Sequence, residues 1–330
     1  MNYFVIFSML LVPAFLFGGV GPIAMTVKDL DVSVPFYRDV LGFKKVDQVE
    51  ISGSDFEHLM GIFGAKANIV TMQLGEEQIQ LIEFVTPKGR PVPLDSRSND
   101  KWFQHIAIIV NDMEKAYSIL KEYEVTHASV APQTLPDWNA KVAGIKAFYF
   151  KDPDGHTLEI LYFPKDKGNP KWQQQSNNVF LGIDHTAIVV GNTEESLKFY
   201  QGLLGMELAG ENINYGSEQE YLNNVFGARV RITSLKSDSG PMIELLEYVT
   251  PRDGRPLPLN SRLNDLWSWL TRVTNKDIAT LEKTLFEKNV HFVSPGIQTL
   301  KTDKLPYKKG MVVRDPDSHA LLITPEDPSR

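Results

Sequence analysis

The chain has 330 residues, 42% of them hydrophobic and 23% charged, which is enough for two domains and is typical of a globular protein with a hydrophobic core. Its 41 acidic and 34 basic residues give a net charge of −7, which argues against a nucleic-acid-binding surface. It contains no cysteine, which excludes disulfides, thiolate metal sites and cysteine nucleophiles.

Residues 1–18 are almost entirely apolar. The run is shorter than the ~20 residues that a helix needs to cross a bilayer, and Pro13 interrupts it. It lacks the basic start and the A-x-A site of a typical signal peptide. We nevertheless expect a signal peptide or an N-terminal anchor here. The protein is then periplasmic or secreted rather than cytoplasmic. If the segment is not cleaved, we expect it to be the only part of the protein that contacts a membrane.

The apolar pattern of residues 22–161 predicts the same order of elements twice: a strand, a helix and three strands. The first copy has its elements at residues 22–27, 32–41, 44–51, 67–74 and 78–85. In the second copy Phe103–Val110 predicts the strand, and Asp112 caps a helix from Met113 to Tyr123. Later strands include 147–150 and 157–161, so each copy is a βαβββ unit.

A polar stretch with proline and glycine at residues 165–179 is typical of a linker. After it, residues 186–190 predict an apolar strand with His185 at its start. Thr193 can cap a helix over 194–204, where Gly205 follows in the position of a left-handed helix end.

An internal repeat then sets the domain organisation. The recurring phrases are 63–65 with 226–228, 86–91 with 250–256, 96–100 with 261–265, and 152–156 with 315–319. We therefore place one domain at 19–164 and a second at 180–326, each built from two βαβββ units.

This plan, with FYRDVLGF at residues 36–43 and DPDGHTLEI at 152–160, resembles the vicinal-oxygen-chelate superfamily. That group includes glyoxalase I, bleomycin-resistance proteins and extradiol dioxygenases, and the likeness is greatest to two-domain glyoxalase-like proteins. The resemblance implies an α+β fold in which four βαβββ units form two cupped mixed β-sheets with flanking helices. It does not fix the reaction, because one fold hosts many chemistries.

In this superfamily the metal ligands come from the first and last strands of a unit. The resemblance assigns these positions, unit by unit, to Pro22 and Gln80, His105 and Glu159, His185 and Glu244, and Leu270 and Leu322. Only the two central units carry the His-plus-Glu pair, so the resemblance implies a metal site made of His105, Glu159, His185 and Glu244. Two imidazoles and two carboxylates suit Zn, Ni, Mn, Fe or Co.

How the units pair decides whether these four residues meet. If each domain closes on itself, Gln80 joins His105 and Glu159 in one site, and the second domain offers only its own pair. In the glyoxalase I arrangement, unit one faces unit four and unit two faces unit three. The two units that lack the His-plus-Glu pair, one and four, face each other in this swapped pairing, and this distribution favours it. With this pairing, a monomer is sufficient to build the site.

Other polar residues have weaker indications. Glu83 and Glu247 repeat three places after Gln80 and Glu244, and odd spacing places them on the opposite face. The remaining histidines are expected in turns (His156 and His319) or on the surface (His58, His127 and His291).

Four arginines lie on the long loops between units and either hold a substrate carboxylate or pin a loop through Asp95 or Asp100: Arg90, Arg97, Arg255 and Arg262. The expected cup-lining residues are Asn212, Asn214, Tyr215 and Gln219, whereas Trp102, Phe103, Trp267 and Trp269 are expected to pack against the sheets.

The resemblance implies three alternatives. The first is a metal-dependent lyase or isomerase of glyoxalase I type, in which a metal holds two adjacent oxygens of a small substrate and stabilises an enediolate. Glu159 then moves the proton, with Glu244 across the metal. The second is an Fe(II)-dependent dioxygenase, although Leu270 and Leu322 occupy two of the places used by extradiol enzymes. The third is a non-catalytic binding or resistance protein, which does not need the intact ligand set.

Overall fold

The computed structural model describes residues 17–326. The expected signal peptide or anchor lies outside the described residues, except for its last two positions, which begin the first strand. Within residues 17–326, no helix is long and apolar enough to cross a membrane.

Each of the four units begins with a strand followed by a helix and ends with two antiparallel strands. Unit one contains β1 (Phe17–Val27), α1 (Leu30–Pro35), the π-helical turn η1 (Phe36–Val40), β2 (Lys44–Ser52), α2 (Ser54–Met60), β3 (Lys66–Leu74) and β4 (Glu77–Thr86). Unit two contains β5 (Gln104–Val110), α3 (Met113–Glu122), β6 (Thr126–His127), β7 (Gln133–Thr134), β8 (Lys146–Lys151) and β9 (Thr157–Tyr162). A 3-10 turn, η2 (Pro170–Gln173), lies in the linker.

The second half of the chain follows the same plan. Unit three contains β10 (Phe180–Val190), α4 (Thr193–Tyr200), β11 (Glu207–Tyr215), α5 (Ser217–Asn223), β12 (Arg229–Lys236) and β13 (Met242–Thr250). Unit four contains β14 (Trp269–Asn275), α6 (Ile278–Glu287), β15 (His291–Phe292), β16 (Gln298–Thr299), β17 (Lys309–Arg314) and β18 (Ala320–Pro325).

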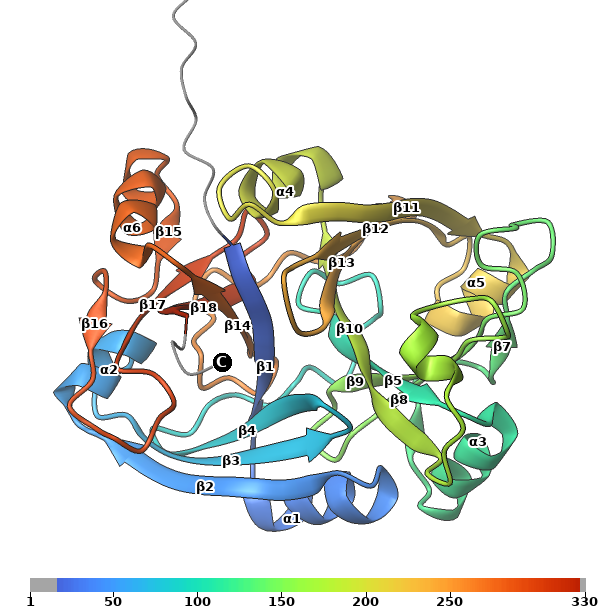
Figure 1. The fold of residues 1–330 in the computed structure, drawn as a ribbon, viewed down its shortest axis with the longest axis horizontal. Helices are drawn as coiled ribbons and strands as arrows, with labels where there is room; N and C mark the ends of the chain where they lie inside the picture. The colour runs from blue at the N-terminus through green and yellow to red at the C-terminus, as the bar shows by residue number, and fades with distance from the viewer. Residues whose placement is uncertain (1–16, 327–330) are drawn as a thin grey trace, which may run out of the picture.

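These strands form two nine-stranded mixed sheets within the described residues, one on each side of the view in Figure 1. One sheet has the order β15-β17-β18-β14-β1-β4-β3-β2, with β16 also paired to β17. The other has the order β11-β12-β13-β10-β5-β9-β8-β6, with β7 also paired to β8. Unit one therefore shares a sheet with unit four through β1 and β14, and unit two shares a sheet with unit three through β5 and β10. The expected swapped pairing is confirmed.

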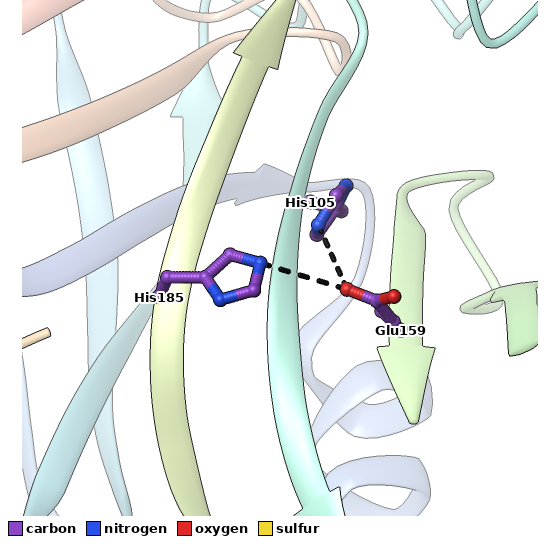
Figure 2. Close-up of side chains that lie close together, drawn as sticks. All are labelled: His105, Glu159 and His185. Carbon is purple, nitrogen blue, oxygen red and sulfur yellow. Dashed lines mark ion pairs between the residues drawn. The ribbon is translucent and has the colours of Figure 1, made fainter. Parts of the chain in front are cut away.

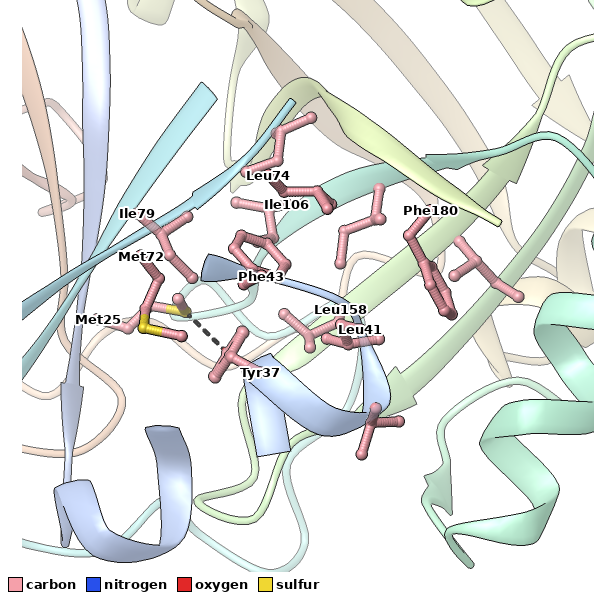
Figure 3. Close-up of a cluster of buried hydrophobic side chains, with 14 of the residues drawn as sticks. Met25, Tyr37, Leu41, Phe43, Met72, Leu74, Ile79, Ile106, Leu158 and Phe180 are labelled. Atoms are coloured by element: carbon pink, nitrogen blue, oxygen red, sulfur yellow. Dashed lines mark hydrogen bonds between the residues drawn. The ribbon is translucent and has the colours of Figure 1, made fainter. Parts of the chain in front are cut away.

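The hydrophobic core connects units that lie in different sheets. One buried cluster joins Tyr37, Met72 and Ile79 of unit one to Ile106 and Leu158 of unit two, as Figure 3 shows. A second buried cluster joins units three and four in the same way. Each half of the chain thus packs its two units back to back, while its strands pair with the other half.

The predicted start of α3 is confirmed, whereas both ends of α4 differ from the prediction. Asp112 caps α3 as expected, since its carboxylate accepts a hydrogen bond from Lys115 N at 3.0 Å. For α4, however, the cap is Asn192 and not Thr193, and the helix ends at Tyr200. Thr193 instead donates its hydroxyl to Glu247 at 2.8 Å, which gives Glu247 a structural role away from the candidate metal ligands.

The two repeated Asp-Pro-Asp turns each bury a histidine against an aspartate. In the first turn, His156 Nδ1 lies 2.8 Å from Asp152 and Nε2 lies 2.6 Å from the Leu266 carbonyl oxygen. Because both ring nitrogens face acceptors, the doubly protonated imidazolium fits this position. Burial opposes that charge, but the Asp152 carboxylate outweighs it and raises the pKa of His156.

This contact predicts a pH-dependent contribution to stability. A raised pKa in the folded state stabilises most below the unfolded value of about 6.5, and the gain is lost as the pH rises through the folded value. We expect the free energy of unfolding lost in His156→Gln to be larger at pH 5.5 than at pH 9, measured by urea denaturation. An equal or larger loss at pH 9 would contradict the charged assignment.

Candidate metal centre

The two candidate histidines come from the strands that join units two and three. In the antiparallel pair β5–β10, His105 lies opposite Ala187, and His185 lies opposite Ala107. Opposed residues, and residues two places apart on one strand, share a face of the sheet. The two imidazoles therefore project from the same face, with ring centroids 5.6 Å apart.

The two candidate glutamates come from the flanking strands. Parallel pairing places Glu159 of β9 beside Ala107, and Glu244 of β13 beside Ala187. Both alanines are fully buried. The register thus arranges four side chains with metal-binding chemistry around two small residues.

Three of the four side chains converge closely, as Figure 2 shows. Glu159 Oε2 lies 3.1 Å from His105 Nε2 and 3.6 Å from His185 Nε2, and one donor atom of each residue lies within 4.8 Å of the others. Glu244 is less central: its Oε2 lies 3.5 Å from His185 Nε2, while its Oε1 accepts a hydrogen bond from Ser234.

His105 carries the clearest sign that this cluster suits a cation. It is 1% exposed, and neither ring nitrogen has a hydrogen-bond partner within residues 17–326, although Nε2 is close to Glu159. Buried polar atoms are normally hydrogen-bonded. A cation bonded along the imidazole lone pair would satisfy Nε2, and the nitrogen and oxygen donors present fit Zn, Ni, Mn, Fe or Co.

The electrostatics of the cluster also favour positive charge. Burial opposes ionisation of Glu159, but the nearby imidazoles of His105 and His185 outweigh it and lower its pKa to about 2. Burial likewise opposes a charged His185, yet Glu244, Asp184 and Glu159 raise its pKa well above the ordinary value. The carboxylates therefore hold a positive charge at His185, and a bound cation would take the place of that proton.

The cluster forms part of the lining of a cavity of about 640 Å³ between β-strands of units two and three. Its apolar wall includes Leu135, Ile145 and Phe163, and the buried phenol of Tyr149 lies against His105 with ring centroids 5.0 Å apart. Burial, followed by the charge of Glu159, raises the pKa of Tyr149 well above its usual value, so its hydroxyl stays protonated.

The other predicted lining residues divide between cavity and surface. Asn212, Asn214 and Gln219 line the cavity, but Tyr215 is exposed and packs on Trp138 with ring centroids 4.5 Å apart. The tryptophans and phenylalanine expected to pack against the sheets are all buried: Trp102, Phe103, Trp267 and Trp269.

The loop arginines pin loops and do not line this cavity. Arg255 binds Asp100 at 2.6 Å and Asp95 at 2.7 Å, and Arg90 makes the equivalent bond to Asp265 at 2.6 Å. Arg97 pairs with an acidic loop residue in the same way, and Arg262 donates its backbone N–H to Asp265. The histidines expected on the surface are exposed: His58, His127 and His291.

The opposite sheet carries a second cup, in which none of the four predicted ligand positions has an imidazole or a carboxylate. Its register matches the first: Ala24 lies beside Gln80 and opposite Leu270. Leu270 and Leu322 are buried in an apolar cluster, as their residue types require. Arg272, beside Leu322, takes the place that Ala107 holds beside Glu159 in the first cup.

Sequence reasoning missed two residues that act on the candidate ligands. Asp184 Oδ2 lies 3.1 Å from His185 Nδ1, and Trp172 Nε1 donates to Asp184 Oδ1 at 2.7 Å. A carboxylate directly before a candidate ligand was a signal available in the sequence. No sequence pattern pointed to Trp172, because it lies in the polar linker.

Comparison with known proteins places this site in a family. The model of the Glyoxalase/Bleomycin resistance protein/Dioxygenase superfamily matches residues 19–160 and 182–323. A 2-epi-5-epi-valiolone epimerase from Actinomyces sp. is 29% identical over 157 residues, which are 46% of this chain and 82% of that protein. The metallothiol transferase FosB of Staphylococcus haemolyticus is 31% identical over 145 residues, which are 43% of this chain and 81% of that protein.

Longer relatives match across much of the chain. The lactoylglutathione lyase of Schizosaccharomyces pombe is 29% identical over 188 residues, 55% of this chain but only 57% of that enzyme. Crystal structures of glyoxalase I from Zea mays and of a point mutant of it superpose with TM-scores of 0.58 and 0.62 at 15% identity, covering 92% of this chain and 90% of theirs. This likeness shows a shared fold. The chain therefore belongs to the Glyoxalase/Bleomycin resistance protein/Dioxygenase superfamily.

Proposed function

We propose that the protein is a metal-dependent enzyme of glyoxalase I type, a lyase or isomerase that moves a proton on a small substrate with two adjacent oxygens. The observation that carries this proposal is the cluster of His105, Glu159 and His185, with Glu244 beside it, in the lining of a cavity. These four residues would hold the metal. A divalent cation bound there would act as a Lewis acid on the substrate oxygens and make a neighbouring C–H bond more acidic.

The chain's own residues would do the rest of the work. Glu159 stays ionised at neutral pH because the two imidazoles lower its pKa to about 2. We assign it the role of the base that accepts the proton. Glu244, whose side chain is 16% exposed, would serve as the second carboxylate on the other side. Apolar side chains form part of the cavity lining, and the protonated Tyr149 hydroxyl can donate to substrate.

All four proposed ligands come from one chain, two from each half. We therefore propose that a monomer is sufficient for the site and that the partner is a small molecule rather than a macromolecule. Lactoylglutathione lyase and 2-epi-5-epi-valiolone epimerase among the relatives support a proton-transfer chemistry, and they differ in substrate.

The test is proton exchange in deuterium oxide. Purified protein loaded with Zn or Ni is incubated with a panel of 2-oxoaldehyde–thiol adducts and α-hydroxycarbonyl compounds, and the C–H signal beside the carbonyl is followed by NMR. We expect exchange or isomerisation of at least one class, and its loss after chelation. The absence of exchange across the panel with metal-loaded protein, or exchange that survives chelation, would contradict the proposal.

A further inference from the structure

We propose that the linker between the two halves of the chain positions a metal ligand, with Trp172 acting on His185 through Asp184. This inference rests on the proposed function, because it assigns a role in holding the metal. Trp172 lies in η2, within the linker at residues 165–179, and is part of the cavity lining. It becomes a positioning residue, not a catalytic one.

Two successive contacts connect Trp172 to the ring of His185. The indole Nε1 of Trp172 donates to Asp184 Oδ1 at 2.7 Å, and Asp184 Oδ2 lies 3.1 Å from Nδ1 of His185. With Asp184 accepting from Nδ1–H, the free nitrogen of the neutral imidazole is Nε2, which faces Glu159 and Glu244. A carboxylate that orients a ligating imidazole is typical of metal sites, and its loss costs 10–100-fold in metal affinity, as an order of magnitude.

The linker turn is held in place from both sheets. Lys171 Nζ bonds Glu77 Oε1 at 2.5 Å, and the other oxygen of Glu77 accepts the backbone N–H of Ile183 at 3.1 Å. The indole also packs on the backbone of Gly182, since a Cβ built there would lie 2.8 Å from the Trp172 ring. These contacts fix the direction of the indole N–H, so Asp184 receives a donor of defined position.

The two candidate histidine ligands differ in what holds their rings in position. His105 has no such contact behind its ring: Nε2 faces Glu159 Oε2 at 3.1 Å, but Nδ1 has no hydrogen-bond partner within the described residues. His185 is slightly more exposed, at 6% against 1%, and has a hydrogen-bonded carboxylate behind it. The Trp172–Asp184 pair therefore supplies, for the more accessible ligand, the orientation that burial supplies for the other.

The test compares two tryptophan variants of the full chain. Trp172→Phe keeps an aromatic ring against Gly182 but removes the N–H donor. Trp102→Phe removes a buried indole hydrogen bond of the same kind, to Ser96 Oγ at 3.0 Å, away from the cavity. Asp184→Asn keeps the side-chain volume but leaves one acceptor oxygen for two donors. Affinity for Zn is measured by competition with a chelating dye, and unfolding by urea denaturation.

We expect Trp172→Phe and Asp184→Asn each to lower Zn affinity by about 10–100-fold. Trp102→Phe should leave the affinity within twofold, whatever it does to stability. In the indole ¹H–¹⁵N spectrum of metal-free protein, the Trp172 signal, assigned by its loss in Trp172→Phe, should exchange slowly with solvent in wild type and faster in Asp184→Asn.

The outcomes separate this inference from the proposed function. Wild-type affinity in Trp172→Phe, or an equal loss of affinity in Trp102→Phe, overturns the positioning role while the metal site stands. A slowly exchanging Trp172 signal in a wild-type protein that binds no Zn, Ni, Mn, Fe or Co overturns the proposed function instead.

Discussion

Replacing either His105 or His185 by alanine is expected to lower the affinity for a divalent metal by more than about 100-fold, beyond the effect of losing an orienting contact alone. Each imidazole supplies a nitrogen to the cluster that has Glu159 at its centre. Removing one leaves fewer donors and an ionised carboxylate without its partner. The measurement is competition with a chelating dye on purified protein.

The second cup supplies the control for this prediction. Gln80 occupies, beside Ala24, the place that Glu244 occupies beside Ala187, so Gln80→Ala alters the equivalent position of the other sheet. It should leave metal affinity unchanged. If His185→Ala kept full affinity while Gln80→Ala lost it, the ligands would belong to one half of the chain, and the shared site would be wrong.

Replacing Glu159 by glutamine is expected to reduce turnover more than metal content. The substitution keeps the volume and one acceptor oxygen but removes the base, and general base catalysis contributes about 10²–10⁴-fold. We expect a loss of turnover in that range for any substrate that the exchange screen identifies, with metal content reduced by a smaller factor. Glu244→Gln, which changes a carboxylate on the far side of His185, is the matched control and should have a smaller effect on turnover.

Parallel losses of metal and turnover in Glu159→Gln would give this residue a role as ligand only. A larger loss of turnover in Glu244→Gln would exchange the roles of the two carboxylates. The readout is turnover per bound metal, with the metal measured by mass spectrometry in the same samples.

The fold was predictable because its signals are local and repeated. Strand and helix positions followed from apolar periodicity and from caps such as Asp112, and the repeated phrases gave four similar units. The swapped pairing is that of the glyoxalase I arrangement, which the resemblance implied and which the distribution of His and Glu among the units favoured. The cap of α4 was misassigned because Asn192 and Thr193 are both good capping residues, and only the backbone geometry separates them.

The candidate site was predictable as a set of residue types and not as a network. His105, Glu159 and His185 meet as expected, because strand alternation and register fix which face each one occupies. The linker contact was not predictable: a polar segment without periodicity gives no indication that Trp172 reaches the cavity. Similarly, the loop arginines bind acidic residues about 155 to 175 positions away, which no local pattern reveals.

The most direct test of one metal site shared by units two and three is an anomalous difference map from crystals of metal-loaded protein. We predict one peak per chain, about 2.0–2.2 Å from nitrogens of His105 and His185 and from oxygens of Glu159 and Glu244. A peak among Gln80, Leu270 and Leu322 in the second cup, or no peak between the two histidines in fully loaded protein, would contradict this assignment.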